Sequence, residues 1–366
     1  MNNGILPSLK GDAKMPNNLY DMVVDYNNLK KSYKTTQKGK RKFKKEAILF
    51  DMARERNLVQ LWRELKNETY SPGDYIKFKI YEPKERIIHA PRIRDKVVQF
   101  AAHVGLMEVY YNKFINTSYA CLLKRGTHRA VQKVQHNMKI CQWKYGDGWV
   151  LKMDIKRYFY SINRDILKKI LRKKIHDDKF LRLLNKIIDS SPEGEKGIPL
   201  GNVTSQDFAN IYLNEVDQYA KRYLGLKYYV RYMDDIIVVL KSKEEAQKAK
   251  QDIEKFLNEK LDLEINDKTK IFPVSQGVNA YGFKIFTTHR LVRDSSKAAM
   301  KRRIKAMDRK VTEGTLDKEY VKQCVNSWLG HSRHSNSYNL CKKIFNKYKY
   351  IEIQNPKYKF GNLNTQ

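Results

Sequence analysis

The chain has 366 residues, enough for about two domains of ordinary size or for one large domain with a smaller addition. It carries 73 Lys and Arg against 40 Asp and Glu, a net charge of +33, and such an excess on a folded chain usually faces a polyanion, nucleic acid before a membrane surface. A hydrophobic share of 41% and 24 tyrosines exclude a disordered polycation, so the chain is expected to fold.

Three features concern the compartment. The longest aliphatic run, Ile236 to Leu240, is far shorter than the roughly 20 residues that a membrane-spanning helix needs. The first residues show no charged segment followed by an apolar one, so no secretory signal is expected. The 4 cysteines form no C-x-x-C pair and are expected to be reduced thiols. We therefore expect a cytoplasmic protein that does not enter a membrane.

The N-terminal part is predicted to be helical and basic. The run Lys38 to Lys45 concentrates its charge, and Phe50 to Leu65 shows apolar residues at helical spacing. Two strands are expected next, over Tyr75 to Tyr81 and Arg86 to Ala90, joined by a turn that contains proline. Asp95 to Tyr111 is apolar on nearly every side, which predicts a helix buried in the core.

The rest of the chain is predicted to alternate helices and strands. A polar helix around residues 128–140 leads into the strand Trp149 to Asp154, which ends on a carboxylate. Ser242 and Glu245 form a capping box that opens an amphipathic helix. Basic helices, notably Lys297 to Lys310, follow in the C-terminal third. The expected architecture is a mixed α/β body between basic helical ends.

Asp234 and Asp235 are the clearest chemical signal. They lie between two strand-forming runs, Tyr228 to Tyr232 and Ile236 to Leu240, so they are expected at the tip of a hairpin. Two adjacent carboxylates repel each other, and Mg²⁺, which prefers hard oxygen ligands, relieves that repulsion. For the pair taken alone, a solvated acidic turn is the alternative.

Asp154 supplies a third carboxylate from a separate strand, and the aromatic residues Tyr158, Phe159 and Tyr160 follow it. Two converging strands can place three carboxylates around two cations. Phosphoryl transfer to a hydroxyl nucleophile uses two such cations about 4 Å apart. For Asp154 alone, the alternative is an N-cap of the helix after the strand.

These residues resemble the motifs of reverse transcriptases. Asp154 with Phe159 is similar to motif A, and Tyr232 to Asp235, with the sequence Tyr-Met-Asp-Asp, is similar to motif C. Gly197 to Asn214 resembles motif B, but it has Pro-Leu-Gly and Ser-Gln where most reverse transcriptases have Pro-Gln-Gly and Ser-Pro. Both departures resemble the enzymes of diversity-generating retroelements.

The resemblance covers most of the chain, from about Tyr70 to Gly282. Lys268 resembles part of motif D, and Trp328 to His331 resembles the thumb end of the retroelement enzymes. A short match to the primer grip of motif E comprises Tyr281, Gly282 and Phe283.

The fold that the resemblance implies is α+β, a right-hand polymerase with fingers, a palm of antiparallel sheet plus helices, and a helical thumb. The expected boundaries are a basic N-terminal helical segment over residues 1–68 and fingers over 69–148. The palm with its insertions is expected over 149–286, and the basic helical thumb with the C-terminal tail over 287–366.

The resemblance also implies a metal site. Asp154, Asp234 and Asp235 are the expected ligands of two Mg²⁺ ions, for which Mn²⁺ is a substitute. Ile155 belongs to the same metal-binding set. Lys268 is implied as the catalytic general acid that protonates the leaving pyrophosphate.

The implied nucleotide-binding set lies on the fingers, after motif A and in motif B, and comprises Phe159, Arg92, Arg94, Leu200, Gly201 and Gln206. Phe159 is the expected steric gate against a 2′-OH. The guanidinium groups of Arg92 and Arg94 suit the β and γ phosphates of a dNTP, with scattered surface charge as the alternative. Gly201 is expected to let the backbone approach template and nucleotide closely.

We therefore expect an RNA-directed DNA polymerase that makes cDNA by two-metal phosphoryl transfer, of the adenine-mutagenic type found in diversity-generating retroelements. Expected partners are a structured template RNA, the RNA–cDNA hybrid, dNTPs and a small basic accessory protein. Lys38 to Lys45 is expected to contact the RNA backbone, with a solvated face as the alternative. The other functions considered are an antiviral defence reverse transcriptase, a polymerase that copies DNA or extends RNA, and a non-catalytic RNA-binding scaffold.

Overall fold

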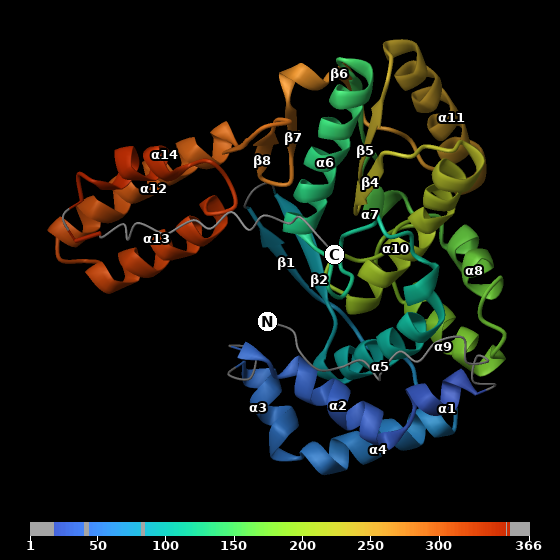
Figure 1. Ribbon diagram of the computed structural model, residues 1–366. Helices are drawn as coiled ribbons and strands as arrows, with labels where there is room; N and C mark the ends of the chain where they lie inside the picture. The colour runs from blue at the N-terminus through green and yellow to red at the C-terminus, as the bar shows by residue number, and fades with distance from the viewer. Residues whose placement is uncertain (1–17, 40–43, 82–84, 349, 352–366) are drawn as a thin grey trace. The chain divides into compact units, whose positions relative to one another are not determined.

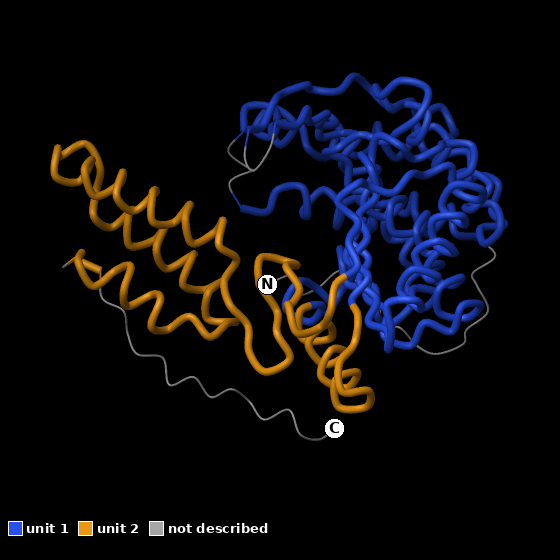
Figure 2. Tube along the Cα trace, turned by 90° about the horizontal axis from the view of Figure 1, so that it is seen from above, with its two compact units in different colours: residues 1–130, 150–271 blue, residues 131–149, 272–366 orange. Residues whose placement is uncertain are grey.

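The computed structural model of the chain describes residues 18–39, 44–81, 85–348 and 350–351. The chain divides into two compact units, which Figure 2 colours separately: unit 1 is residues 1–130 with 150–271, and unit 2 is residues 131–149 with 272–366. Within the residues described, no helix combines the length and the apolarity that crossing a bilayer requires. The four-part division expected from the sequence stays a prediction.

Unit 1 begins with helices α1 (Leu19–Val23), α2 (Tyr26–Thr36), α3 (Lys45–Met52) and α4 (Arg54–Lys66). The predicted helical structure over Phe50 to Leu65 is confirmed, but it is divided between two helices, because the φ of −122° and ψ of 36° at Ala53 are not helical. Met52, apolar in the predicted pattern, therefore ends α3 and is exposed. The basic run Lys38 to Lys45 lies partly outside the described residues.

The next elements of unit 1 confirm the predicted hairpin and buried helix. Strands β1 (Ile76–Ile80) and β2 (Arg86–Ala90) pair antiparallel, while the turn between them falls mainly outside the described residues. α5 (Ile93–Tyr110) is buried along most of its length. A Cβ added at Gly105 would meet Val23 at 2.6 Å and Phe180 at 2.8 Å, so glycine lets neighbouring helices approach α5.

A four-stranded sheet, here called the central sheet, has the strand order β4-β5-β3-β6. Its strands are β3 (Trp149–Asp154), β4 (Tyr229–Tyr232), β5 (Asp235–Leu240) and β6 (Lys270–Pro273). The run Ile236–Val239 is buried throughout, which fits a strand covered on both faces. α11 (Lys243–Leu261) packs against β5, as Figure 1 shows. Ser242 caps α11, since its hydroxyl accepts from the Glu245 N–H at 3.2 Å, which confirms the first half of the predicted capping box. The Glu245 carboxylate accepts from the Lys241 N–H at 3.4 Å, one residue before the N-cap.

Further helices of unit 1 are α7 (Tyr158–Ser161), α8 (Arg164–Arg172), α9 (Asp178–Asp189) and α10 (Val203–Gln218). Short 3₁₀ turns lie at Tyr111–Lys113 and, in unit 2, at Val274–Gln276, and a π-helical turn at Tyr219–Tyr223 follows α10. α10 is buried on nearly every side, and it packs against α5 and α8. It is therefore the central helix of this unit.

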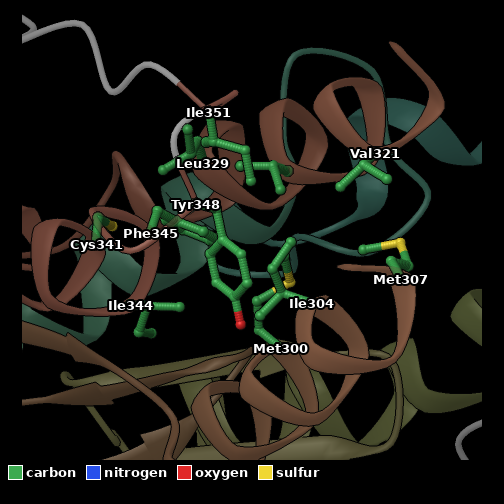
Figure 3. Close-up of a cluster of buried hydrophobic side chains, with 11 residues drawn as sticks. Met300, Ile304, Met307, Val321, Leu329, Cys341, Ile344, Phe345, Tyr348 and Ile351 are labelled. Carbon is green, nitrogen blue, oxygen red and sulfur yellow. The ribbon is translucent and has the colours of Figure 1, made fainter. Parts of the chain in front are cut away.

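Unit 2 combines a small sheet with helices. Its elements are most of α6 (Thr127–Tyr145), strands β7 (Val278–Ala280), β8 (Phe283–Ile285) and β9 (Arg290–Val292), and helices α12 (Asp294–Thr312), α13 (Lys318–Ser332) and α14 (Tyr338–Phe345). The strands form an antiparallel sheet in chain order. The helices α12 to α14, here called the bundle, enclose an apolar cluster in which Tyr348 lies among Met300, Ile304 and Phe345 (Figure 3).

Candidate active site

The β4–β5 hairpin places the paired carboxylates at its tip, as predicted. Tyr232 pairs with Asp235, so Met233 and Asp234 form a two-residue turn, which we call the Met233–Asp234 turn. Met233 has a φ of 55°. Turns with a positive φ at the first central position ordinarily take glycine there, and another residue costs on the order of 1–3 kcal/mol. The turn is therefore strained and needs support from its surroundings.

Charge accumulates at this turn. Asp234 is half-buried, and its pKa is raised to about 6, chiefly by burial and further by the charges of Asp154 and Asp235, while Arg86 opposes the shift. Because Asp154 ends β3 and β3 lies next to β5 in the central sheet, two adjacent strands bring the three carboxylates together. Lys152 of β3 lies 3.9 Å from Asp235 and partly balances its charge.

The segment after α11 runs beside the end of β3. The carbonyl of Asp154 accepts from the Asn266 N–H at 2.7 Å, and Ile155 forms an antiparallel bridge with Ile265. Lys268, two residues after Asn266, is exposed in the turn before β6, where its N–H donates to the Asn266 side chain at 3.1 Å. The predicted general acid is thus two residues from Asn266, whose N–H is hydrogen-bonded to Asp154.

The donor chemistry of the site fits Mg²⁺. Carboxylate oxygens are its preferred protein ligands, and a divalent cation offsets both the burial of the Asp234 charge and the repulsion from Asp154 and Asp235, which together raise the Asp234 pKa. Across the described parts of the chain, however, no group of three or more His, Cys, Asp or Glu side chains is arranged so that it could hold a metal ion. The two-ion site on Asp154, Asp234 and Asp235, with Ile155, therefore stays a prediction.

Phe159 lies in α7, directly after the end of β3. The neighbouring Tyr158 is buried, and its hydroxyl donates to the Ala209 carbonyl of α10 at 2.5 Å. The Phe159 ring is half-buried and meets the Tyr158 ring edge-on at 5.7 Å. The Phe159 carbonyl accepts from the Ile198 N–H at 2.8 Å, which joins motif A to motif B. The function of the Phe159 ring as a steric gate stays a prediction.

The start of motif B is fixed to β2. The Leu200 carbonyl accepts from the His89 N–H at 2.9 Å. Gly201 has a φ of 131°, and a Cβ there would lie 2.5 Å from the His89 carbonyl oxygen. The sequence predicts a close approach of Gly201 to template and nucleotide, and the close approach that the structure shows is to the backbone of β2. Leu200 is half-buried, whereas Gln206 is exposed on α10.

The two arginines predicted to bind phosphates differ in their surroundings. Arg94 donates to the Ser71 carbonyl at 3.0 Å, pairs with Glu64, and lies over the Tyr70 ring at 4.9 Å. Arg92 is exposed at the N-cap of α5. The contacts of Arg94 give it a structural role in unit 1, and phosphate binding by either arginine stays a prediction.

The predicted primer grip lies in unit 2, at the turn between β7 and β8. Tyr281 and Gly282 have φ values of 53° and 88°, which is the geometry of a two-residue hairpin turn with both residues at positive φ. His331 of α13 stacks on Phe283 with ring centroids 4.4 Å apart, and a Cβ on Gly282 would meet the His331 ring at 2.9 Å. Glycine is therefore needed here for the stacking as well as the turn.

A buried ion pair lies beneath the Met233–Asp234 turn, and the sequence patterns did not predict it. Arg231 of β4 pairs with Asp217 of α10 at 2.6 Å, and both side chains are completely buried. The sequence does contain one sign of this ion pair. Arg231 is a charged residue inside the strand run Tyr228 to Tyr232, where a central strand ordinarily carries apolar side chains.

Comparison with known proteins places this site in a family. The sequence profile of the reverse transcriptase (RNA-dependent DNA polymerase) family matches residues 77–285. The chain belongs to the reverse transcriptase family. The match includes the Met233–Asp234 turn, Asp154 and the segment of motif B. It confirms the predicted enzyme class, an RNA-directed DNA polymerase, and the predicted α+β fold of the right-hand polymerase type.

Individual proteins that resemble this chain share less than a third of their residues with it. Protein YkfC of Escherichia coli (strain K12) is 29% identical over 263 residues, which cover 60% of this chain and 67% of YkfC. The group II intron-encoded protein LtrA of Lactococcus lactis subsp. cremoris is 25% identical over 338 residues, 72% of this chain and 54% of LtrA. The solved structure of apo telomerase from Candida tropicalis, truncated from the C-terminal domain, has a TM-score of 0.45 and 13% identity, covering 64% of this chain and 58% of telomerase. The chain thus spans about two thirds of YkfC and about half of LtrA.

Proposed function

We propose that this reverse transcriptase copies a structured RNA template into cDNA by extending a primer 3′-OH with dNTPs. The observation that carries the proposal is that Asp154, Asp234 and Asp235 lie at the ends of adjacent strands, where burial, and further the charges of the other two carboxylates, raise the pKa of Asp234. The net charge of +33 supports a nucleic-acid substrate.

In the proposed reaction the primer 3′-oxygen attacks the α-phosphorus of the dNTP, and pyrophosphate leaves. Bound Mg²⁺ would supply charge stabilisation for the attacking and leaving oxygens. The three carboxylates would hold the ions, with Ile155 in the same set. Lys268 would donate a proton to the leaving pyrophosphate, and the ring of Phe159 would occupy the space of a 2′-OH.

We further propose the finer assignment to the mutagenic enzymes of diversity-generating retroelements, with a small basic accessory protein as a partner. Its support lies in motif B. Leu200 stands where most reverse transcriptases have a Gln, and its backbone is fixed by the bond to His89. An aliphatic side chain donates no hydrogen bond to the nascent base pair. Because such polar contacts contribute about 1–3 kcal/mol of discrimination, their loss permits errors.

Sequencing cDNA from a defined RNA template tests both proposals. The parent should make cDNA with Mg²⁺ or Mn²⁺ and should misincorporate mainly opposite adenine, while Leu200→Gln should lower that error about ten- to hundredfold. Leu200→Met is the matched control, because it stays apolar at similar volume and should keep the parental error rate.

The outcomes separate the alternatives. A parent that binds RNA but makes no cDNA contradicts the polymerase proposal and favours an RNA-binding scaffold. Active synthesis with uniformly low error at adenine contradicts the retroelement assignment and favours an antiviral defence enzyme. A high adenine error that Leu200→Gln does not change leaves the assignment standing and places the cause elsewhere in the site.

A further inference from the structure

The buried ion pair beneath the Met233–Asp234 turn has defined geometry. Arg231 donates from Nε and Nη2 to the two carboxylate oxygens of Asp217 at 2.7 and 2.6 Å. The Tyr229 hydroxyl donates to the same carboxylate at 2.7 Å. A two-pronged contact of this kind fixes the plane of a guanidinium group. The remaining nitrogen, Nη1, is thereby aimed in one direction.

That direction is toward the turn. Nη1 of Arg231 donates to the backbone carbonyl of Met233 at 3.0 Å and to the Asn210 side-chain oxygen at 3.2 Å. The carbonyl belongs to the peptide bond between Met233 and Asp234, so this hydrogen bond fixes the plane of that peptide. Met233 adopts a positive φ, which a residue with a side chain keeps only where its surroundings hold it.

The backbone of Arg231 is held as well. Its N–H donates to the Thr117 carbonyl at 2.9 Å, and its carbonyl accepts from the Tyr119 N–H at 3.0 Å. The loop containing these residues thus forms a parallel bridge with β4 at Arg231. Helix, strand and loop together define where the guanidinium group lies, so it is a rigid support.

We propose that Arg231 and Asp217 are positioning residues for nucleotide addition: they hold the Met233–Asp234 peptide in one orientation and thereby set the direction of the Asp234 carboxylate. The inference rests on the proposed polymerase function and deepens it. The rival explanation is fold stability alone. It is the weaker one, because the loss of hydration largely offsets the attraction within a buried ion pair.

Graded variants test the proposal in primer extension at saturating RNA. Tyr229→Phe removes one donor to Asp217 and should lower kcat about two- to tenfold. Arg231→Lys keeps the charge but loses the fork and the bond to Met233, so kcat should fall about ten- to hundredfold. Affinity for RNA and KM for dNTP should change less than twofold, because the side chains of Tyr229 and Arg231 are completely buried.

Glycine at the turn supplies a readout that a role in stability alone would not move. Gly adopts a positive φ without support. In a Met233→Gly background, Tyr229→Phe and Arg231→Lys should therefore lower kcat several-fold less than they do in the parent. All rates are compared well below each variant's unfolding temperature, which thermal unfolding measures.

Tyr212→Phe is the matched control. Tyr212 lies on the same helix as Asp217, is equally buried, and donates its hydroxyl to the Leu261 carbonyl at 2.6 Å rather than toward the turn. Tyr212→Phe should leave kcat per folded molecule within twofold of the parent. If it lowers kcat as much as Tyr229→Phe does, the effect is general and the proposal is overturned.

If Tyr229→Phe and Arg231→Lys lower kcat equally in the parent and in the Met233→Gly background, the proposal is overturned too. If Arg231→Lys does not fold, the kcat of Tyr229→Phe alone is compared between the two backgrounds. A parent without any dNTP incorporation defeats the polymerase function and this inference together. An active parent whose variants all match Tyr212→Phe defeats the positioning role alone.

Discussion

The central sheet and the bundle place charge in opposite ways. Around the sheet, Arg231 and Asp217 are completely buried and Asp234 is half-buried beside two other carboxylates. The bundle encloses an apolar cluster instead (Figure 3). Cations such as Lys301 and Arg302 lie exposed on α12. Buried charge costs desolvation but fixes directions, whereas exposed charge attracts a polyanion without a fixed geometry. Buried charge with a fixed direction suits phosphoryl transfer, and exposed charge without a fixed geometry suits binding along RNA.

The largest effect is expected at the turn. Asp234→Asn removes a carboxylate charge at nearly constant volume, so dNTP incorporation should fall thousands-fold, the consequence of losing several kcal/mol of stabilisation. RNA affinity should stay within about twofold, since the basic surface is unchanged. Single-turnover incorporation and RNA binding measure the two effects. Incorporation within about tenfold of the parent would contradict the role of Asp234 in metal binding.

Substitutions in the bundle should change the stability of the protein rather than the rate of catalysis. Phe345 is completely buried and meets the Trp328 ring edge-on at 5.8 Å, so Phe345→Ala should lower the free energy of unfolding of unit 2 by about 3–5 kcal/mol. Denaturant unfolding followed by tryptophan fluorescence measures the change. Tyr320→Ala, at a half-exposed ring of the same bundle, is the control and should shift stability by about 0.5 kcal/mol or less. Equal shifts would show that the apolar cluster does not determine the stability of this unit.

A smaller effect is expected in sugar selection. Phe159→Ala should raise the acceptance of rNTPs relative to dNTPs about ten- to two-hundredfold, the range for emptying one apolar group from a pocket. The ratio of kcat/KM for the two nucleotides measures it. Tyr160→Ala is the control, because that ring contacts the Arg157 guanidinium instead, at 5.4 Å. An unchanged ratio in Phe159→Ala would leave Phe159 as a packing residue next to Tyr158.

Local sequence patterns predicted the elements whose causes are local. The bounds of β3, the hairpin tip at Asp234 and the Ser242 cap all follow from strand periodicity, turn residues and capping chemistry. Contacts between distant residues were not predictable in this way. The ion pair of Arg231 with Asp217 joins β4 to α10, and that of Arg94 with Glu64 joins α5 to α4, so both depend on the tertiary fold. The family resemblance gave predicted roles for the site residues, but it did not predict these two ion pairs.

The smallest expected effect concerns one exposed cation of the bundle. Arg302 lies on α12, and among the described residues no ion pair is found for it, so its charge is available to a phosphate. Arg302→Gln should lower the slope of log affinity for RNA against log salt by about 0.7–0.9, the contribution of one released counterion, and should leave kcat unchanged.

Lys322→Gln is the matched control for Arg302→Gln. Lys322 is a cation of the same bundle, but it lies 3.5 Å from Glu319, whose charge partly offsets its own. Its replacement should change the salt slope by much less than one phosphate contact. Titrations of a single-stranded RNA at several salt concentrations compare the two variants with the parent. If neither slope changes, the exposed charge of α12 serves solubility, and the contrast between a catalytic interior and a binding exterior does not extend to this helix.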